Sequence, residues 1–223
     1  MTVMLQDRTT AGRDLARALM KYRKRPNVIV LGLPRGGVPV AAEIAHELHA
    51  PLDLMVVRKL GTPGQEELAM GAIASGGVRV LNPDVVTPLG ISDEAIERVV
   101  AREQAELGRR MAAYRGERPW PSLEDKRVIL VDDGVATGAT MRAAIAALRA
   151  QRPAQVIVAV PVAPIDTLSR LRSEADDVVC LATPEPFGAI RHVLREFSTI
   201  VGRRSAARVV AAMGEEDAAA GAP

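Results

Sequence analysis

The feature that most constrains this chain is a series of short apolar runs that alternate with helix-like segments. Runs that are apolar throughout are typical of strands buried on both faces, whereas the segments between them repeat apolar residues every three or four positions. Alternation of this kind predicts an α/β fold with a mostly parallel central sheet and helices on both of its faces. The predicted strands cover residues 27–33, 52–61, 127–132, 154–162 and 176–182.

Glycine-rich or charged segments lie at the ends of three of these runs. The turn PRGG (34–37) comes after the first, Arg58 and Lys59 end the second, and DDGVATGAT (132–140) comes at the end of the third. In open α/β sheets, ligands bind in the crevice beyond the carboxyl ends of the strands. We therefore expect these three segments to face one common site.

Helices are predicted before and after the first run. Residues 9–23 show helical spacing of apolar positions, with Thr9 or Thr10 as the N-cap, and residues 38–49 form a second helical segment. Further along, residues 68–81 indicate two short strands joined near Gly76-Gly77.

A long helix is predicted over 93–115, with Ser92 as its N-cap. Acids lie early in it and arginines late, as the helix dipole favours. Its apolar side fits either the core or a dimer surface, so a homodimer is one arrangement that the sequence allows.

Composition excludes several classes of protein. The 223 residues are 48% hydrophobic but only 2% aromatic, so the core must be aliphatic. A balance of 29 basic against 27 acidic residues gives no argument for nucleic-acid binding. No apolar stretch is long enough to span a membrane, and Cys180 alone cannot form an internal disulfide, which fits a reducing cytoplasm.

The loop that follows Asp133 has the composition of a phosphate cradle. Small residues allow a phosphate to approach the unpaired N–H groups at the start of the next helix, and Thr137 and Thr140 add hydroxyl donors. The loop is not a Walker loop, because no Gly-Lys-Ser/Thr follows, and it lacks the GxGxxG dinucleotide pattern.

Asp132 and Asp133 stand directly before this cradle. Adjacent carboxylates repel each other and need partners, and the vicinal hydroxyls of a ribose would donate charge-assisted hydrogen bonds to them. Two carboxylates that would bind a diol stand next to a loop that would bind a phosphate. Together they predict a sugar 5-phosphate with free 2- and 3-hydroxyls as the ligand.

An apolar strand, two acids and a TGxT cradle together resemble the phosphoribosyl-pyrophosphate signature of type I phosphoribosyltransferases. LGLPRGGVPVA is similar to the pyrophosphate loop of that family, and VVRKLG to the strand that supplies a pyrophosphate-binding basic residue. More narrowly, the chain resembles the bacterial group of substrate-unassigned members that carry LPRGGVPVA and DDGVATGAT.

The resemblance implies a role for each motif. Asp132 and Asp133 would hold the ribose hydroxyls and would reach Mg²⁺ through water, the metal being bound mainly by substrate oxygens. The 5-phosphate would be bound by Ala136, Thr137, Gly138, Ala139 and Thr140. The pyrophosphate would be bound by Arg35, Gly36 and Gly37, with Lys59 or Arg58 opposite. The resemblance also implies a cis peptide bond from Pro34 to Arg35.

The implied activity is transfer of the 5-phosphoribosyl group from phosphoribosyl pyrophosphate to a nitrogenous, nucleobase-like acceptor, with release of pyrophosphate. Asp132, Asp133, Arg35 and Lys59 would carry the catalysis. The alternatives are a non-catalytic regulatory protein of the same fold and, with less support, a hydrolase or nucleotide phosphorolysis enzyme. The pyrophosphate loop and Lys59 favour the transferase, because a sensor of nucleotide monophosphates would need neither.

The chain departs from the purine-salvage pattern at Ala136, where those members carry an acid that handles a ring proton. We therefore expect an acceptor other than hypoxanthine. Phe187 falls where the family places its base-covering hood, although it fits equally an ordinary hydrophobic anchor. Residues 61–77 fit either a lid over the reaction or a plain loop that leads into the hairpin.

These patterns predict a single domain over residues 1–213. Its predicted parts are a core, an insertion that holds the hairpin and the long helix, and a C-terminal hood, followed by a small polar tail that is predicted to be disordered. The core covers about 1–60 and 120–182, the insertion 61–119, the hood 183–213 and the tail 214–223.

Overall fold

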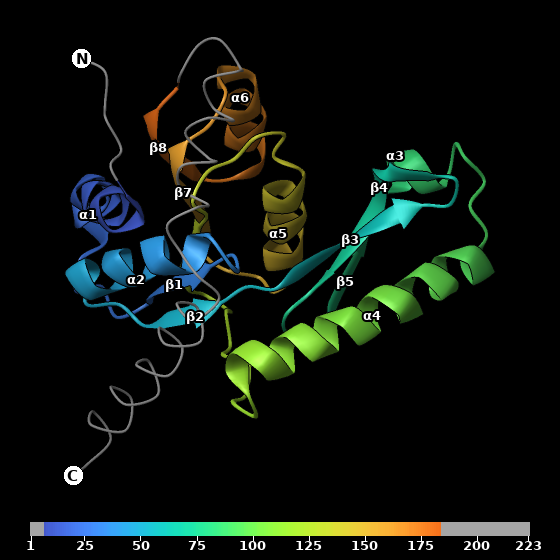
Figure 1. Ribbon diagram of the computed structural model, residues 1–223, viewed down its shortest axis with the longest axis horizontal. Coiled ribbons are helices and arrows are strands. Elements are labelled where there is room, and N and C mark those ends of the chain that lie inside the picture. The colour runs from blue at the N-terminus through green and yellow to red at the C-terminus, as the bar shows by residue number, and fades with distance from the viewer. Residues whose placement is uncertain (1–6, 184–223) are drawn as a thin grey trace.

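The computed structural model describes residues 7–183 of the chain. Within these residues, five parallel strands form a central sheet in the order β2-β1-β6-β7-β8. The strands are β1 (Val28–Gly32), β2 (Leu52–Leu54), β6 (Arg127–Val131), β7 (Gln155–Val162) and β8 (Asp177–Ala182). The predicted α/β fold with a mostly parallel sheet is confirmed (Figure 1).

Helices cover both faces of this sheet, as predicted. One face carries α1 (Arg8–Ala18), the 3-10 helix η1 (Met20–Tyr22) and α2 (Gly37–Leu48), and the other carries α5 (Ala139–Arg149) and α6 (Ile165–Glu174). Side chains alternate between the faces, so Val28 and Val30 of β1 pack with α1 and α2, whereas Ile29 and Leu31 pack with α5 and α6. Burial on both faces explains why the strand sequences are apolar throughout.

The strand order reverses between β1 and β6. From β1 the chain passes through α2 to β2 at one side, and from β6 it passes through α5 to β7 at the other. The register pairs Gly32 with Val131, the last residues of the two strands, and the Leu33 amide donates to the Val131 carbonyl at 2.8 Å. The loops after β1 and β6 therefore leave the sheet at the same level, at the switch point where α/β sheets bind ligands.

The apolar run over 52–61, predicted as one strand, is divided between two sheets. β2 ends at Leu54, and β3 (Val57–Thr62) belongs to a separate antiparallel sheet. Ser75 holds the chain between them, because its hydroxyl accepts from the Val56 amide at 2.9 Å and its own amide donates to the Val56 carbonyl at 2.9 Å. The prediction that Arg58 and Lys59 end a strand of the central sheet is therefore wrong, since both lie inside β3.

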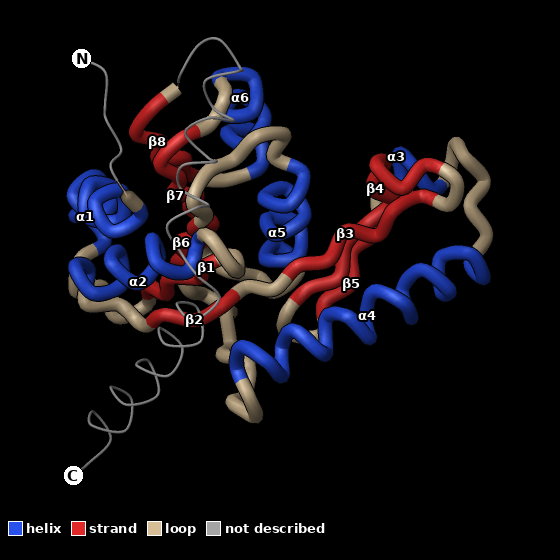
Figure 2. Tube along the Cα trace, viewed as in Figure 1, coloured by secondary structure: helices blue, strands red, loops and turns tan. Residues whose placement is uncertain are grey.

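The antiparallel sheet and two helices form an arm, by which we mean residues 57–115. Its elements are β3, β4 (Gln65–Ala74), β5 (Val78–Leu81), α3 (Pro83–Val86) and α4 (Asp93–Arg115). The predicted hairpin is confirmed, with Gly76 and Gly77 in the turn between β4 and β5. The arm extends away from the central sheet, with α4 lying along its strands (Figures 1 and 2).

The arm has a hydrophobic cluster of its own. The apolar side of α4 packs on one face of the small sheet, which accounts for the apolar positions that the sequence shows in this helix. The buried members of this arm cluster are Val56, which directly precedes the arm, and Leu60, Met70, Ile73, Ile96, Val100 and Leu107.

Helix starts agree with the sequence at α4 and differ at α1. Ser92 caps α4 by accepting from the Ala95 amide at 3.3 Å, as predicted. At α1 the cap is Asp7, whose carboxylate accepts from the Thr10 amide at 2.7 Å, so the prediction of Thr9 or Thr10 is wrong. A carboxylate placed earlier in the chain reaches the free amides of the first turn and leaves both threonines inside the helix.

None of the helices in residues 7–183 combines the length and the apolar character needed to cross a membrane. Residues 184–213, predicted to form a hood that includes Phe187, and the predicted tail over 214–223 lie outside the described residues. The division of the chain into core, insertion and hood stays a prediction.

Candidate active site

The loops after β1 and β6 are in direct contact. A Cβ atom added to Gly36 would overlap the carboxylate of Asp133, and one added to Gly37 would lie 2.5 Å from the Val131 carbonyl oxygen and 2.8 Å from Asp132 Cα. Only glycine allows so close an approach at these positions. The peptide bond between Pro34 and Arg35 is cis, as predicted. The structure thus brings PRGG and the acid pair, two of the predicted site segments, side by side.

The two acids differ in their surroundings. Burial and then the charge of Asp133 raise the pKa of Asp132 well above its ordinary value, although the Asp133 amide donates to its Oδ1 atom at 2.9 Å. The residue as a whole is of intermediate exposure. A buried acid beside a second acid needs a donor, as the sequence indicated.

Arg8 is a partner of the acid pair that the sequence did not reveal. This side chain begins α1, is 8% exposed, and donates to Asp133 Oδ2 from Nε at 3.0 Å and from Nη2 at 2.5 Å. The ion pair joins residues 125 positions apart. No local pattern around Arg8 marks it, because its function depends on how α1 crosses the sheet.

The predicted cradle lies at the start of α5. Gly138 is the N-cap of this helix and has a φ of 79°, a left-handed conformation that favours glycine. Thr137, Ala139 and Thr140 are exposed, and the Ala139 amide approaches Thr137 Oγ1 at 3.5 Å. A helix N-terminus with exposed hydroxyls and small side chains is suited to an anion such as phosphate.

Thr167 supports the cradle from a neighbouring element, and it was missed in the sequence. Its hydroxyl, on the first turn of α6, donates to the Ala136 carbonyl at 2.8 Å, and the residue is 7% exposed. A Cβ atom at Gly138 would lie 2.9 Å from Thr167 Cγ2, so the Thr167 side chain packs directly against Gly138. Because β7 neighbours β6, the parallel strand order would have suggested that the segment after β7 lies against the cradle.

The predicted cations take three different environments. Arg35 is exposed and has no ion-pair partner among residues 7–183. Arg58 points toward α4, where it donates to Glu103 Oε2 from Nε at 2.9 Å and from Nη2 at 2.5 Å. Lys59, the next residue of β3, points to the opposite face and reaches the Glu67 carbonyl at 3.1 Å.

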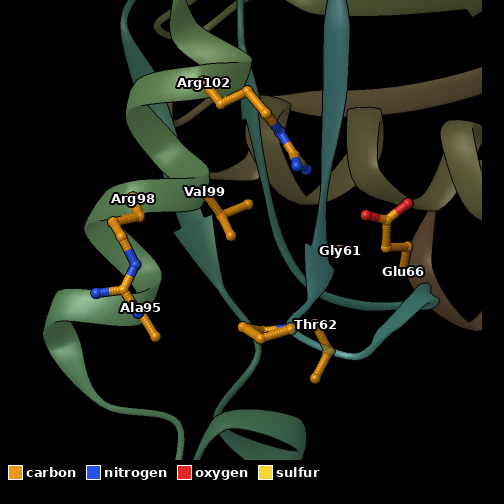
Figure 3. Close-up of a pocket in the computed structure, with 8 residues that line it drawn as sticks. Gly61, Thr62, Glu66, Ala95, Arg98, Val99 and Arg102 are labelled. Atoms are coloured by element: carbon orange, nitrogen blue, oxygen red, sulfur yellow. The ribbon is translucent and has the colours of Figure 1, made fainter.

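A pocket of about 260 Å³ lies in the arm, between the β3–β4 turn and α4. Figure 3 shows Arg102 extending from α4 toward this hairpin. No residue of the predicted site lines the pocket, whose lining residues are Gly61, Thr62, Pro63, Glu66, Ala95, Arg98, Val99 and Arg102. Residues 61–77, predicted as either a lid or a connecting loop, lie largely within the β3–β4 hairpin.

Metal ligands are scarce in the part of the chain that the structure describes. No group of three or more His, Cys, Asp or Glu side chains in residues 7–183 is arranged to hold a metal ion. Two adjacent carboxylates at the switch point suit Mg²⁺, which keeps several waters and takes its other ligands from phosphates.

The fold and these loops define a class of protein. The chain belongs to the phosphoribosyl transferase domain family, whose model matches residues 4–190. It is 48% identical over 195 residues to two Mycobacterium tuberculosis proteins, from strains CDC 1551 / Oshkosh and ATCC 25618 / H37Rv, each named "putative phosphoribosyl transferase". The match covers 87% of this chain and 44% of each relative, so the chain spans less than half the length of these proteins.

A crystal structure shows the same fold. The protein TT1426 from Thermus thermophilus is 43% identical to this chain and superposes with a TM-score of 0.74. The superposition covers 83% of this chain and 88% of that protein. The resemblance to type I phosphoribosyltransferases is thereby confirmed for the family and the fold.

Proposed function

We propose that this chain transfers the 5-phosphoribosyl group from phosphoribosyl pyrophosphate to a nitrogenous acceptor, with release of pyrophosphate. One observation carries the proposal: Gly36 of the PRGG loop lies against Asp133, beside the cradle that begins α5. A ligand held at both places would have its diol and 5-phosphate on one loop and its pyrophosphate on the other. Phosphoribosyl pyrophosphate has these groups in this order.

The acid pair and the cradle would bind the sugar phosphate. Asp132 and Asp133 would accept hydrogen bonds from the 2- and 3-hydroxyls, and exposed Thr137 and Thr140 would donate to the 5-phosphate. Ala136, Gly138 and Ala139 would complete the cradle through their small size and backbone amides. Holding both ends of the sugar fixes C1 relative to the acceptor.

The pyrophosphate would lie on the PRGG loop. Gly36 and Gly37 keep the loop backbone close to β6, and Arg35 offers an exposed guanidinium. Of the two cations on β3, we favour Lys59, because Arg58 is paired with the buried Glu103, whereas the ion pair of Lys59 is with the fully exposed Glu67. Magnesium, when bound with the substrate, would offset the charge of the leaving pyrophosphate, with Asp132 or Asp133 reaching it through water.

The acceptor is expected to differ from hypoxanthine. Ala136 has no group that can move a proton, so the protein cannot supply acid or base catalysis from this position. Phe187, proposed to cover the acceptor base, lies outside the described residues. A nitrogenous acceptor that needs no proton relay at position 136 fits this site.

The test is a panel of nucleobases and amines incubated with the purified chain, phosphoribosyl pyrophosphate and Mg²⁺. Nucleotide formation is followed by chromatography with mass detection, and pyrophosphate release is measured with and without each acceptor. Acceptor-dependent formation of a nucleotide supports the transferase. Release that does not depend on an acceptor would indicate a hydrolase, and binding without turnover across the panel would indicate a regulatory protein.

Asp133→Asn provides the matched variant. Loss of a charge-assisted hydrogen bond to a sugar hydroxyl should weaken the affinity for ribose 5-phosphate by roughly 1.5–3 kcal/mol. Arg149→Gln is the control, because it removes an ion pair at the other end of α5. Unchanged affinity in the Asp133 variant would contradict the diol assignment.

A further inference from the structure

Arg8 contacts only one oxygen of the Asp133 carboxylate. Its Nε and Nη2 atoms donate to Oδ2, at 3.0 Å and 2.5 Å. These two contacts leave Oδ1 outside the fork of Arg8. Asp133 also acts on Asp132, whose pKa is raised by burial, by the charge of Asp133 and by a side-chain hydrogen bond with it. Arg8 therefore holds the Asp133 carboxylate by one of its two oxygens.

The position of Arg8 is fixed by the packing of α1 on α2. Gly12 of α1 approaches α2 so closely that a Cβ atom there would lie 2.6 Å from Glu43 Cβ and 2.9 Å from the Val40 carbonyl oxygen. Leu15 and Ala16 continue this contact in the buried cluster between the helices and the sheet. Since α2 itself begins at Gly37, one rigid unit holds both Arg8 and the PRGG loop.

The carboxylate of Asp133 is confined on its other side as well. Gly36 lies against it, so the side chain cannot swing toward the PRGG loop. Its exposed fraction is 19%, against 9% for the side chain of Arg8. The carboxylate is thus enclosed by a cation and a backbone, with a limited opening toward solvent.

We propose that Arg8 is a positioning residue for Asp133, the acid proposed to bind the hydroxyls of the sugar. Its forked contact with Oδ2 sets the rotation of the Asp133 carboxylate, so that Oδ1 faces the sugar hydroxyl, and its charge offsets the repulsion between the two adjacent acids. The inference rests on the proposed function, because it concerns how the same site distinguishes a vicinal diol from a sugar that lacks one hydroxyl.

The measurement that tests this is the ratio of affinities for ribose 5-phosphate and 2-deoxyribose 5-phosphate, by calorimetry without metal. The two probes share the 5-phosphate and differ in one hydroxyl, so the ratio isolates the contact with the acid pair. We expect the wild-type chain to prefer ribose 5-phosphate by about tenfold or more. Arg8→Gln, which keeps a donor but loses the charge and the fork, should reduce that preference to about threefold or less.

Two further variants separate positioning from a general structural effect. In Arg8→Gln/Asp133→Asn, the ratio should equal that of Asp133→Asn alone, because Arg8 acts through Asp133. Arg13→Gln removes another arginine of α1, whose ion pair with Glu43 is exposed, and should leave the ratio unchanged. If Arg8→Gln does not fold, Arg8→Lys serves instead, since a single ammonium cannot reproduce the fork and should lower the ratio at least about threefold.

The outcomes distinguish a failure of the positioning role of Arg8 from a failure of the proposed function. A wild-type preference that persists in folded Arg8→Gln or Arg8→Lys would overturn the positioning role and leave the proposed function intact. A wild-type chain that binds neither sugar phosphate, or binds both equally, would overturn the diol assignment and the inference with it.

Discussion

Arg115 and Asp53 form a two-point ion pair that joins the end of α4 to strand β2. Arg115 Nε lies 2.9 Å from Asp53 Oδ1, and Nη2 lies 2.7 Å from Oδ2. The residues are 5% and 9% exposed, and the guanidinium also lies 5.1 Å from the ring centre of Trp120. This contact is therefore a buried link between the arm and the central sheet.

Arg115→Met should destabilise the fold by about 3–5 kcal/mol, because it leaves the Asp53 carboxylate buried without its cation. Arg115→Met/Asp53→Asn should recover much of this loss, since no uncompensated charge remains. Urea denaturation measures both, with Arg98→Ala as the control, because its pair with Glu94 is exposed. Equal losses in the single and double variants would show that the charge is not the cause.

Lys59→Met and Arg58→Met should have different effects, although the residues are adjacent. Lys59→Met should raise KM for phosphoribosyl pyrophosphate about tenfold at unchanged stability, through loss of a charge-assisted contact. Arg58→Met should lower the free energy of unfolding by about 1–3 kcal/mol, because Glu103 loses its forked partner. Steady-state kinetics and thermal unfolding distinguish them, and the opposite pattern would assign the pyrophosphate contact to Arg58.

Gly36→Ala should damage the site because the added Cβ atom overlaps the Asp133 carboxylate. Displacement of this side chain should cost about 1–3 kcal/mol of stability and weaken the binding of ribose 5-phosphate. Gly108→Ala is the control, since nothing lies within 4 Å of a Cβ atom there and the residue is inside α4. It should stabilise the protein by about 0.5–1 kcal/mol. Normal sugar-phosphate affinity in Gly36→Ala would contradict the placement of the two loops.

Thr167→Val should weaken the binding of ribose 5-phosphate about fivefold, because the Ala136 carbonyl loses its hydrogen-bond donor and the cradle loosens. Thr167→Ser keeps the hydroxyl and should restore most of the affinity. Calorimetric titration of both variants makes the comparison. Ser169→Ala removes an exposed hydroxyl of the same helix and should have no effect, and equal affinities for the valine and serine variants would rule out the hydrogen bond as the cause.

Glu103 should make the stability depend on acid pH. Burial alone would raise its pKa, but hydrogen bonds and charges from Arg58 and Arg102 outweigh it and lower the pKa below the ordinary 4.5. A lowered pKa in the folded state means that this contribution is complete above about pH 4.5 and is lost as the pH falls through the folded-state value. Urea denaturation of wild type and Glu103→Gln should thus differ most above that pH and converge below it. A constant difference would contradict the assignment.

The central sheet could be predicted from the sequence because both of its faces are covered. Continuous apolar runs such as 128–131 are typical of strands buried on both faces, and the small residues after Asp133 predict a phosphate cradle, which stays a prediction. The run over 52–61 was mispredicted because periodicity does not show where a chain leaves one sheet for another. That point is set by Ser75, whose contact with Val56 is made only in the folded chain.

The proposed site could be inferred from the sequence where its residues are neighbours in the chain, and it was hidden where they are not. Asp132, Asp133 and the loop over 136–140 form one segment with a recognisable pattern. Arg8 and Thr167 reach this segment from α1 and α6 through tertiary packing, and neither carries a local signal. The proposed preference for Lys59 over Arg58 also needed the structure, because it depends on which face of β3 packs on α4.

The separate hydrophobic cluster of the arm has a consequence for how this chain tolerates substitution. Volume changes at Leu60 or Ile96 would be accommodated between α4 and the small sheet, whereas those at Leu31 or Leu130 would be transmitted to the switch point. In a saturation mutagenesis experiment that measures abundance and activity separately, the substitutions should therefore fall into two groups, separated at the Ser75–Val56 junction. Substitutions in the arm cluster would change abundance first, and those in the buried core of the central sheet would change both together.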